Sequence, residues 1–206
     1  MLFSDIEKLL NNAKIIGKLH KKKIKYITDH SYDVCPYSLL VIDKNKNFKK
    51  SYLKEAISRG LTTILTNSYL KTYNITQIIV KDLNKEVYKL ISYKKPFKPK
   101  ISIAITGTNG KTSTAWYLAQ ICKLNNIPTK LTGTIGQFKN LKKIKDSTLT
   151  TPSNLDLYQF AYSDKKNRDT FISEASSHGL HQGRYRNLNI DVAAITNISH
   201  DHLDYH

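Results

Sequence analysis

The sequence predicts an α/β protein of two domains, each built around a mostly parallel sheet. Short apolar segments rich in Ile, Val and Thr alternate with amphipathic segments in both halves of the chain, which is the pattern of strands joined through helices. Residues 93–100 interrupt this pattern with two prolines and four lysines. A chain of 206 residues can form two ordinary cores, so we expect domains at about 1–97 and 98–206.

The first half carries the signals of three helices and two strands. Ser4 and Glu7 form a capping-box pattern ahead of a short helix. Apolar residues at helical spacing between residues 49 and 59, followed by Gly60, predict a second helix and its end. The other expected elements are strands at 61–66 and 77–80 and a helix that begins after Asp82 or Asn84.

The second half repeats the alternation with a longer helix. Residues 101–106 have the composition of a buried strand, and a helix is expected from 111 to about 124 with Cys122 on its apolar side. Further expected elements are a strand near 130–132, a helix at 153–161 and strands at 171–174 and 192–196. Because parallel strands end at one edge of their sheet, the polar residues that follow them should meet there.

The net charge of +17 comes from 33 basic and 16 acidic residues, and 29 of the basic ones are lysine. Arginine, which reads bases through its bidentate fork, is scarce, so we attribute the charge to codon bias and expect no nucleic-acid partner. No apolar run is long enough to cross a bilayer and no signal-peptide pattern opens the chain, which favours a cytoplasmic protein without a membrane partner. Two distant cysteines, Cys35 and Cys122, suit a reducing compartment.

A glycine turn directly after the 101–106 strand is the sharpest motif of the chain. Its residues are Gly107, Thr108, Asn109, Gly110, Lys111, Thr112 and Ser113. A strand, a glycine turn and a helix in this order present backbone N–H groups and the positive end of a helix dipole to an anion. Lys111 can then reach the outer phosphates of ATP, and the Thr112 hydroxyl can ligate the accompanying Mg²⁺. A structural turn with a surface lysine is the plainer alternative, which the strand and helix on either side disfavour.

A carboxylate and a group of histidines follow two later strands. Glu174 ends the strand at 171–174, while His200 and His202 follow the strand at 192–196. We expect the sheet to bring Glu174, the histidines and the glycine turn to one edge. The spacing of His200, His202 and Asp204 is also typical of metallo-β-lactamase-like zinc hydrolases, but these require a histidine where this chain has Tyr205. For each histidine, hydrogen bonding in a polar loop is the remaining alternative.

Taken together, four ordered motifs resemble the Mur ligases, most closely the MurE group of that family. The motifs occupy residues 107–112, 150–152, 174–184, and 196–197 with 201–206. The resemblance implies a small N-terminal α/β domain that binds UDP, followed by part of a P-loop-type ATPase domain. It implies an ATP-dependent amide ligase of peptidoglycan precursor synthesis. Such a ligase adds a third amino acid, meso-diaminopimelate or lysine, to UDP-N-acetylmuramoyl-L-Ala-D-Glu through an acyl phosphate.

The resemblance also implies roles for individual residues. Residues 107–113 would bind the ATP phosphates, with Lys111, Glu174 and His202 catalytic. Mg²⁺ would be held by Thr112, Glu174 and His202. The muramyl-peptide substrate would contact Thr150, Thr151, Ser176, Gln182 and Arg184. We expect a monomer whose partners are this substrate and an amino acid.

The first half departs from the family pattern. Where MurE-like proteins carry Asp-Ser-Arg and then Val-x-Pro-Gly, this chain has His-Ser-Tyr at 30–32 and Val-Cys-Pro-Tyr at 34–37. Ser31 matches and is expected to contact the uridine nucleotide. The family pattern continues past residue 206 with a carbamylated lysine and a third domain, so we expect the 206-residue chain alone to bind ATP poorly and not to complete ligation. Two alternatives stay open: a nucleotide-binding remnant without ligase activity, and a basic nucleic-acid-binding protein that only the charge supports.

Overall fold

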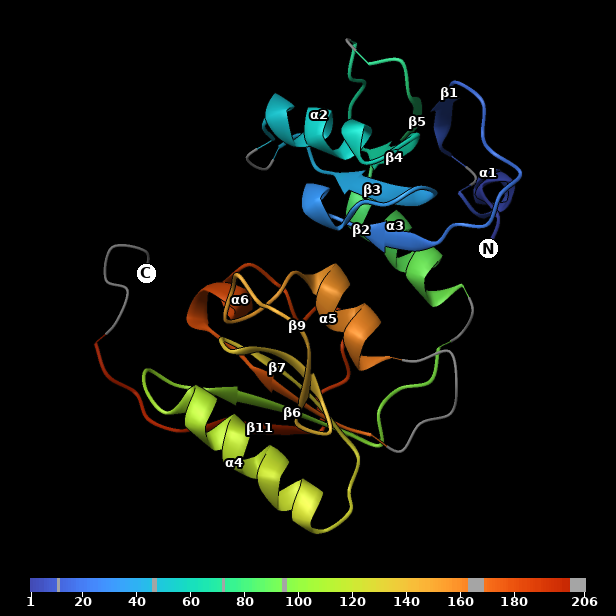
Figure 1. The fold of residues 1–206 in the computed structure, drawn as a ribbon. Helices are drawn as coiled ribbons and strands as arrows, with labels where there is room; N and C mark the ends of the chain where they lie inside the picture. Colours follow the sequence, from blue (N-terminus) through green and yellow to red (C-terminus); the bar gives the residue numbers. More distant parts are fainter. Residues whose placement is uncertain (11, 46–47, 72, 94–95, 163–168, 201–206) are drawn as a thin grey trace. The chain divides into compact units, whose positions relative to one another are not determined.

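The chain divides into two compact units, Met1–Lys94 and Lys95–His206, in a computed structural model (Figure 1). The structure describes all residues except 11, 46–47, 72, 94–95, 163–168 and 201–206. One unit holds a five-stranded sheet and the other a six-stranded sheet. Within the described residues, no helix is both long enough and apolar enough to cross a membrane.

The sheet of the first unit has the strand order β1-β5-β4-β3-β2. Its strands are β1 (Lys14–Ile16), β2 (Tyr26–Thr28), β3 (Ser38–Ile42), β4 (Thr63–Thr66) and β5 (Thr76–Ile79). β2 to β5 pair in parallel, and β1 pairs with β5 in the antiparallel sense at the edge. The expected mostly parallel sheet is therefore confirmed, with β1, β2 and β3 as strands beyond the two expected at 61–66 and 77–80.

Helices lie on both faces of this sheet (Figure 1). They are α1 (Ile6–Leu9), α2 (Lys50–Ser58) and α3 (Leu83–Ser92), with the one-turn segments η1 (Phe3–Asp5) and η2 (Ser31–Asp33). Leu53 and Ala56 of α2 pack in one core with Leu40 and Ile64 of the sheet. The spacing of the apolar residues in the helix thus matches the sheet face that it covers.

Two helix boundaries of the first unit can be compared with the sequence signals. Asp82, one of the two expected start points, caps α3 because its Oδ1 accepts the Lys85 N–H at 3.0 Å. The capping box expected from Ser4 and Glu7 is wrong. The chain turns earlier, at Leu2, whose N–H donates to Asp5 Oδ2 at 2.7 Å, so the carboxylate that reaches back belongs to Asp5.

The sheet of the second unit has the strand order β11-β6-β10-β7-β8-β9. Its strands are β6 (Ile101–Thr106), β7 (Thr129–Gly133), β8 (Gly136–Lys139), β9 (Lys142–Lys145), β10 (Thr170–Glu174) and β11 (Val192–Ile195). β11, β6, β10 and β7 are parallel, and an antiparallel hairpin of β8 and β9 extends the sheet beyond β7. β10 thus lies between two strands that both precede it in the chain.

The helices of the second unit are α4 (Lys111–Leu124), α5 (Asn154–Ala161) and α6 (Ser177–His181). α4 covers one face of the sheet, and α5 and α6 lie on the other (Figure 1). The sheet has a hydrophobic core on each face, and neighbouring residues of β10 contribute to different ones. Ile172 packs with α4, and Phe171 packs with Leu157 and Ala161 of α5. Cys122 is buried on α4, as expected, and burial raises the pKa of its thiol.

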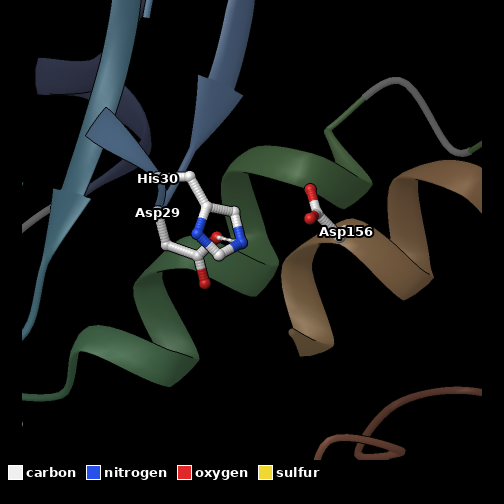
Figure 2. Close-up of side chains that lie close together, drawn as sticks. All are labelled: Asp29, His30 and Asp156. Atoms are coloured by element: carbon white, nitrogen blue, oxygen red, sulfur yellow. Dashed lines mark ion pairs between the residues drawn. The ribbon is translucent and has the colours of Figure 1, made fainter. Parts of the chain in front are cut away.

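An acidic residue in the first turn of α5 is held by local contacts. The Asp156 N–H donates to the Ser153 hydroxyl at 3.2 Å, which caps the helix at the expected position. The Asp156 side chain, drawn in Figure 2, is buried and lies 3.9 Å from Lys145 Nζ.

Candidate nucleotide and metal site

The glycine turn runs from the end of β6 to the start of α4, as the sequence predicts. Gly107 and Gly110 have φ values of 132° and 83°, which other residues rarely adopt. A Cβ on Gly107 would also lie 2.8 Å from the backbone oxygen of Asn197. Gly110 is the N-cap of α4 and offers no capping side chain, so the first N–H groups of the helix are available to an anion.

The Lys111 ammonium is held by the loop itself. Its Nζ donates to the carbonyl oxygens of Gly107 at 2.6 Å and of Thr108 at 3.0 Å. Two backbone acceptors therefore keep the positive charge beside the loop N–H groups, where it adds to the field of the helix N-terminus.

The segment that follows β11 braces the same loop. Thr108 and Asn109 donate backbone N–H groups to the backbone oxygen and the side-chain oxygen of Asn197, at 3.2 and 3.0 Å. The Thr196 hydroxyl donates to the Asn109 carbonyl at 2.6 Å. Thr196 and Asn197 thus shape the turn, a role that the sequence pattern alone did not assign to them.

Glu174 ends β10 with its side chain buried beside this loop. It is 1% exposed and accepts hydrogen bonds from Thr112 Oγ1 at 2.7 Å, Thr134 N at 3.0 Å and Thr134 Oγ1 at 3.0 Å. In the described part of the chain its side-chain partners are these neutral donors, with no basic group in ion-pair contact. A buried carboxylate balanced only by neutral donors suits a cation, and carboxylate and hydroxyl oxygens are ligands that Mg²⁺ prefers.

Two residues at the end of β7 were missed by sequence reasoning. Thr134 donates to both Glu174 oxygens, and a Cβ on Gly133 would overlap the Glu174 carboxylate. β7 lies next to β10 in the sheet, which the order of strands along the chain does not reveal. No sequence motif includes Gly133 and Thr134, and only the strand order of the folded sheet places them beside Glu174.

The residues expected to hold the muramyl peptide form one hydrogen-bonded group around Thr151. Its hydroxyl donates to the Glu174 carbonyl at 2.8 Å and lies 3.0 Å from Ser176 Oγ. Arg184 Nη1 donates to the Thr151 carbonyl, and Arg184 Nη2 donates to Gln182 Oε1 at 2.6 Å. The residues expected to hold the muramyl peptide therefore contact the backbone of Glu174, whose side chain lies beside the glycine turn.

Thr150 joins the two sides through its hydroxyl. Its Oγ1 lies 3.1 Å from Thr134 Oγ1, which in turn contacts Glu174.

Tyr185, which sequence reasoning also missed, contacts the last two residues of β10. Its hydroxyl lies 3.0 Å from Ser173 Oγ and 3.1 Å from the Glu174 carbonyl, and burial raises the pKa of Tyr185 to about 12.

Three expected site residues remain, namely Ser31, Ser113 and His202. Ser31 lies in the first unit, where its hydroxyl donates to Glu55 Oε2 at 2.9 Å. The preceding His30 Nε2 lies 3.5 Å from Asp29 Oδ1 (Figure 2). His202 lies outside the described residues, and Ser113 is exposed on the first turn of α4.

Residues 105–206 match the family model described as the Mur ligase middle domain. The chain is 38% identical over 201 residues to a UDP-N-acetylmuramoyl-L-alanyl-D-glutamate--2,6-diaminopimelate ligase of Rickettsia conorii (strain ATCC VR-613 / Malish 7), which is 95% of this chain and 42% of that protein. A protein with the same name from Chlamydia pneumoniae is 32% identical over 208 residues, 98% of this chain and 43% of that protein. The chain thus spans about two fifths of the length of the curated relatives it matches.

A solved structure agrees on the fold. The structure of a UDP-N-acetylmuramoyl-L-alanyl-D-glutamate--2,6-diaminopimelate ligase matches with a TM-score of 0.67 and 22% identity, over 100% of this chain and 42% of that one. The family model covers the last two residues of β6 and everything after them, and the curated relatives extend the match through the first unit. Residues 105–206 therefore belong to the Mur ligase family, and the rest of the chain resembles its diaminopimelate ligases.

Proposed function

We propose that the protein is an ATP- and Mg²⁺-dependent amide ligase that adds a third amino acid, meso-diaminopimelate, to UDP-N-acetylmuramoyl-L-Ala-D-Glu. The observation that carries the proposal is the buried Glu174 carboxylate, hydrogen-bonded to Thr112 in the first turn of the helix that follows the glycine loop. The names of the Rickettsia and Chlamydia relatives support the choice of substrate and amino acid.

On the phosphate side, residues 107–113 bind the ATP phosphates through the N–H groups that open α4 and through the Lys111 ammonium. Thr112, Glu174 and His202 hold Mg²⁺, which when bound neutralises phosphate charge. The chain's own contribution is to fix these groups before the substrate arrives, since Lys111 and Glu174 each already have at least two partners. A MurF ligase from Thermotoga maritima has been solved in complex with ADP, which supports the nucleotide in this proposal.

On the substrate side, we assign residues 1–97 to the UDP end and residues 98–206 to ATP and the reacting carboxylate. Ser31 contacts the uridine nucleotide. Thr150, Thr151, Ser176, Gln182 and Arg184 position the muramyl peptide. Arg184 supplies a planar cationic fork that suits a carboxylate. The protein acts as a monomer in the cytoplasm on these small molecules.

The proposal is tested by ADP release from the complete gene product with ATP, Mg²⁺, UDP-muramyl dipeptide and diaminopimelate, with lysine as the competing amine. Release that depends on diaminopimelate is expected, and its absence would refute the proposal. Lys111→Ala should lower kcat/KM by about 100-fold or more, the size seen when a charge-stabilising donor is lost. Lys123→Ala, on the exposed last turn of the same helix, is the matched control and should change little. Nucleotide binding without amine-dependent ADP release would identify the alternative, a nucleotide-binding protein without ligase activity.

A further inference from the structure

We propose that Thr134 is a positioning residue that sets the orientation of the Glu174 carboxylate for Mg²⁺ and couples it to Thr150 on the muramyl-peptide side. Neither residue 134 nor its neighbour Gly133 belongs to the motifs that identify the family. The inference rests on the proposed function, because it concerns the same metal and substrate.

Thr134 contacts the carboxylate with two different donors. Its backbone N–H lies 3.0 Å from Glu174 Oε1, and its hydroxyl lies 3.0 Å from Glu174 Oε2. A carboxylate held at both oxygens by one residue cannot rotate about its terminal bond without losing a charge-assisted hydrogen bond. Thr134 therefore restrains both oxygens and, together with Thr112, which donates to Oε2 at 2.7 Å, determines which lone pairs of Glu174 point away from the protein donors.

The close approach of β7 to Glu174 depends on Gly133. Any Cβ at this position would overlap the carboxylate, so the Glu174 side chain lies directly against the backbone of residue 133. The next residue is thereby placed where its N–H and its hydroxyl both reach the carboxylate. Gly133 makes room for Glu174, and Thr134 orients it.

The single hydroxyl proton of Thr134 links the two sides of the site. Thr134 Oγ1 lies 3.0 Å from Glu174 Oε2 and 3.1 Å from Thr150 Oγ1, and it can donate to only one of them at a time. The charged carboxylate is the stronger acceptor while its charge is uncompensated. Neutralisation of Glu174 by a cation frees this proton for Thr150, so metal occupancy alters the hydrogen bonding of a residue that holds the substrate.

The exposure of Thr134 distinguishes the positioning of Glu174 from a structural role in the core. Thr134 is exposed, whereas Glu174 is 1% exposed. Loss of the Thr134 hydroxyl should therefore leave the core intact while it removes one of the three donors that orient the carboxylate. A valine at this position retains the shape of the side chain and the backbone N–H.

The test compares Thr134→Val with Thr134→Ser in the complete gene product, titrating Mg²⁺ against a fixed concentration of ADP and measuring nucleotide binding by calorimetry. Thr134→Val should raise the Mg²⁺ concentration for half-maximal binding by about 10- to 100-fold, as outer-shell changes at metal sites do, and Thr134→Ser should restore it to within about threefold. Thr114→Val, at an exposed threonine of α4, should match the wild type.

A second readout tests the coupling. In the wild type, the affinity for UDP-muramyl dipeptide should rise with Mg²⁺, and Thr134→Val should abolish that rise. An unchanged Mg²⁺ requirement in Thr134→Val, together with loss of binding in Lys111→Ala, would overturn the role of Thr134 and leave the proposed function standing. Absence of Mg²⁺-dependent ADP binding in the wild type would overturn both.

Discussion

Replacement of Gly133 by alanine should destabilise the second unit only as long as Glu174 is present. The added Cβ would lie 2.5 Å from Glu174 Cδ and 2.7 Å from Cγ, whereas ordinary contacts begin near 3.4 Å. The carboxylate must therefore shift by roughly 1 Å, which breaks hydrogen bonds that now measure 2.7 to 3.0 Å. Overpacking of this kind costs about 1–3 kcal/mol in the free energy of unfolding.

A double-mutant cycle isolates that cost. All three atoms nearest to the added Cβ belong to the Glu174 side chain beyond its Cβ, so Glu174→Ala removes the obstruction. In that background Gly133→Ala should be neutral or stabilising by up to about 1 kcal/mol, because alanine restricts the unfolded chain. The coupling between the two sites should therefore be about 2 kcal/mol.

Urea unfolding followed by tryptophan fluorescence measures each corner of the cycle. The single tryptophan, Trp116, lies on α4 in edge-to-face contact with Phe138 of β8, with ring centroids 5.1 Å apart, so it reports on this unit. Equal costs of Gly133→Ala with and without Glu174 would refute the reasoning, since the destabilisation would then come from the backbone of β7.

Three further outcomes are expected. Lys130→Met should lower the free energy of unfolding by about 3 kcal/mol because it leaves the buried Asp169, now 3.7 Å from Lys130 Nζ, without its ion-pair partner, and adding Asp169→Leu should recover most of the loss in urea titrations. Tyr185→Phe should cost about 1 kcal/mol. Because the pKa of Tyr185 is raised from 10.0 to about 12, this contribution should be complete below pH 10 and decline between pH 10 and 12, a decline that the variant lacks in unfolding curves against pH. Cys35 should react with a thiol reagent well before Cys122, whose buried thiol has a raised pKa, and equal rates by mass spectrometry would contradict the assigned burial.

The parts of the fold that the sequence predicts well are those with local causes. The strand at 101–106, the glycine turn and the helix from 111 appear at the expected residues because β-branched residues, positive-φ glycines and helical spacing each act within a few positions. The same holds for the start of α5 at the Ser153 cap. The expected meeting of Glu174 with Thr112 followed from parallel strands sharing one edge, and their 2.7 Å contact agrees with it.

What the sequence did not predict depends on contacts between distant segments. The hairpin of β8 and β9 turns at Asn140 and Leu141 with φ values of 50° and 63°, and a leucine gives no sign of such a turn. In the sequence the lysines of β9 resemble a solvated cluster, because the strand that pairs with them is β8, which is itself held by β7. Thr134 escaped notice for a related reason, since its partner Glu174 lies 40 residues away in sequence.

The position of β10 in the sheet has a consequence for synthesis on the ribosome. Both neighbours of β6, namely β10 and β11, lie later in the chain, so the strand that leads into the glycine loop emerges with neither edge paired. Residues 101–106 must remain unpaired, and exposed to chaperones, until residues 170–174 have left the exit tunnel. When β10 inserts between β6 and β7, it brings Glu174 to the glycine loop in the same step. A nascent chain that does not yet include β10 therefore lacks both the paired strand before the loop and the carboxylate beside it.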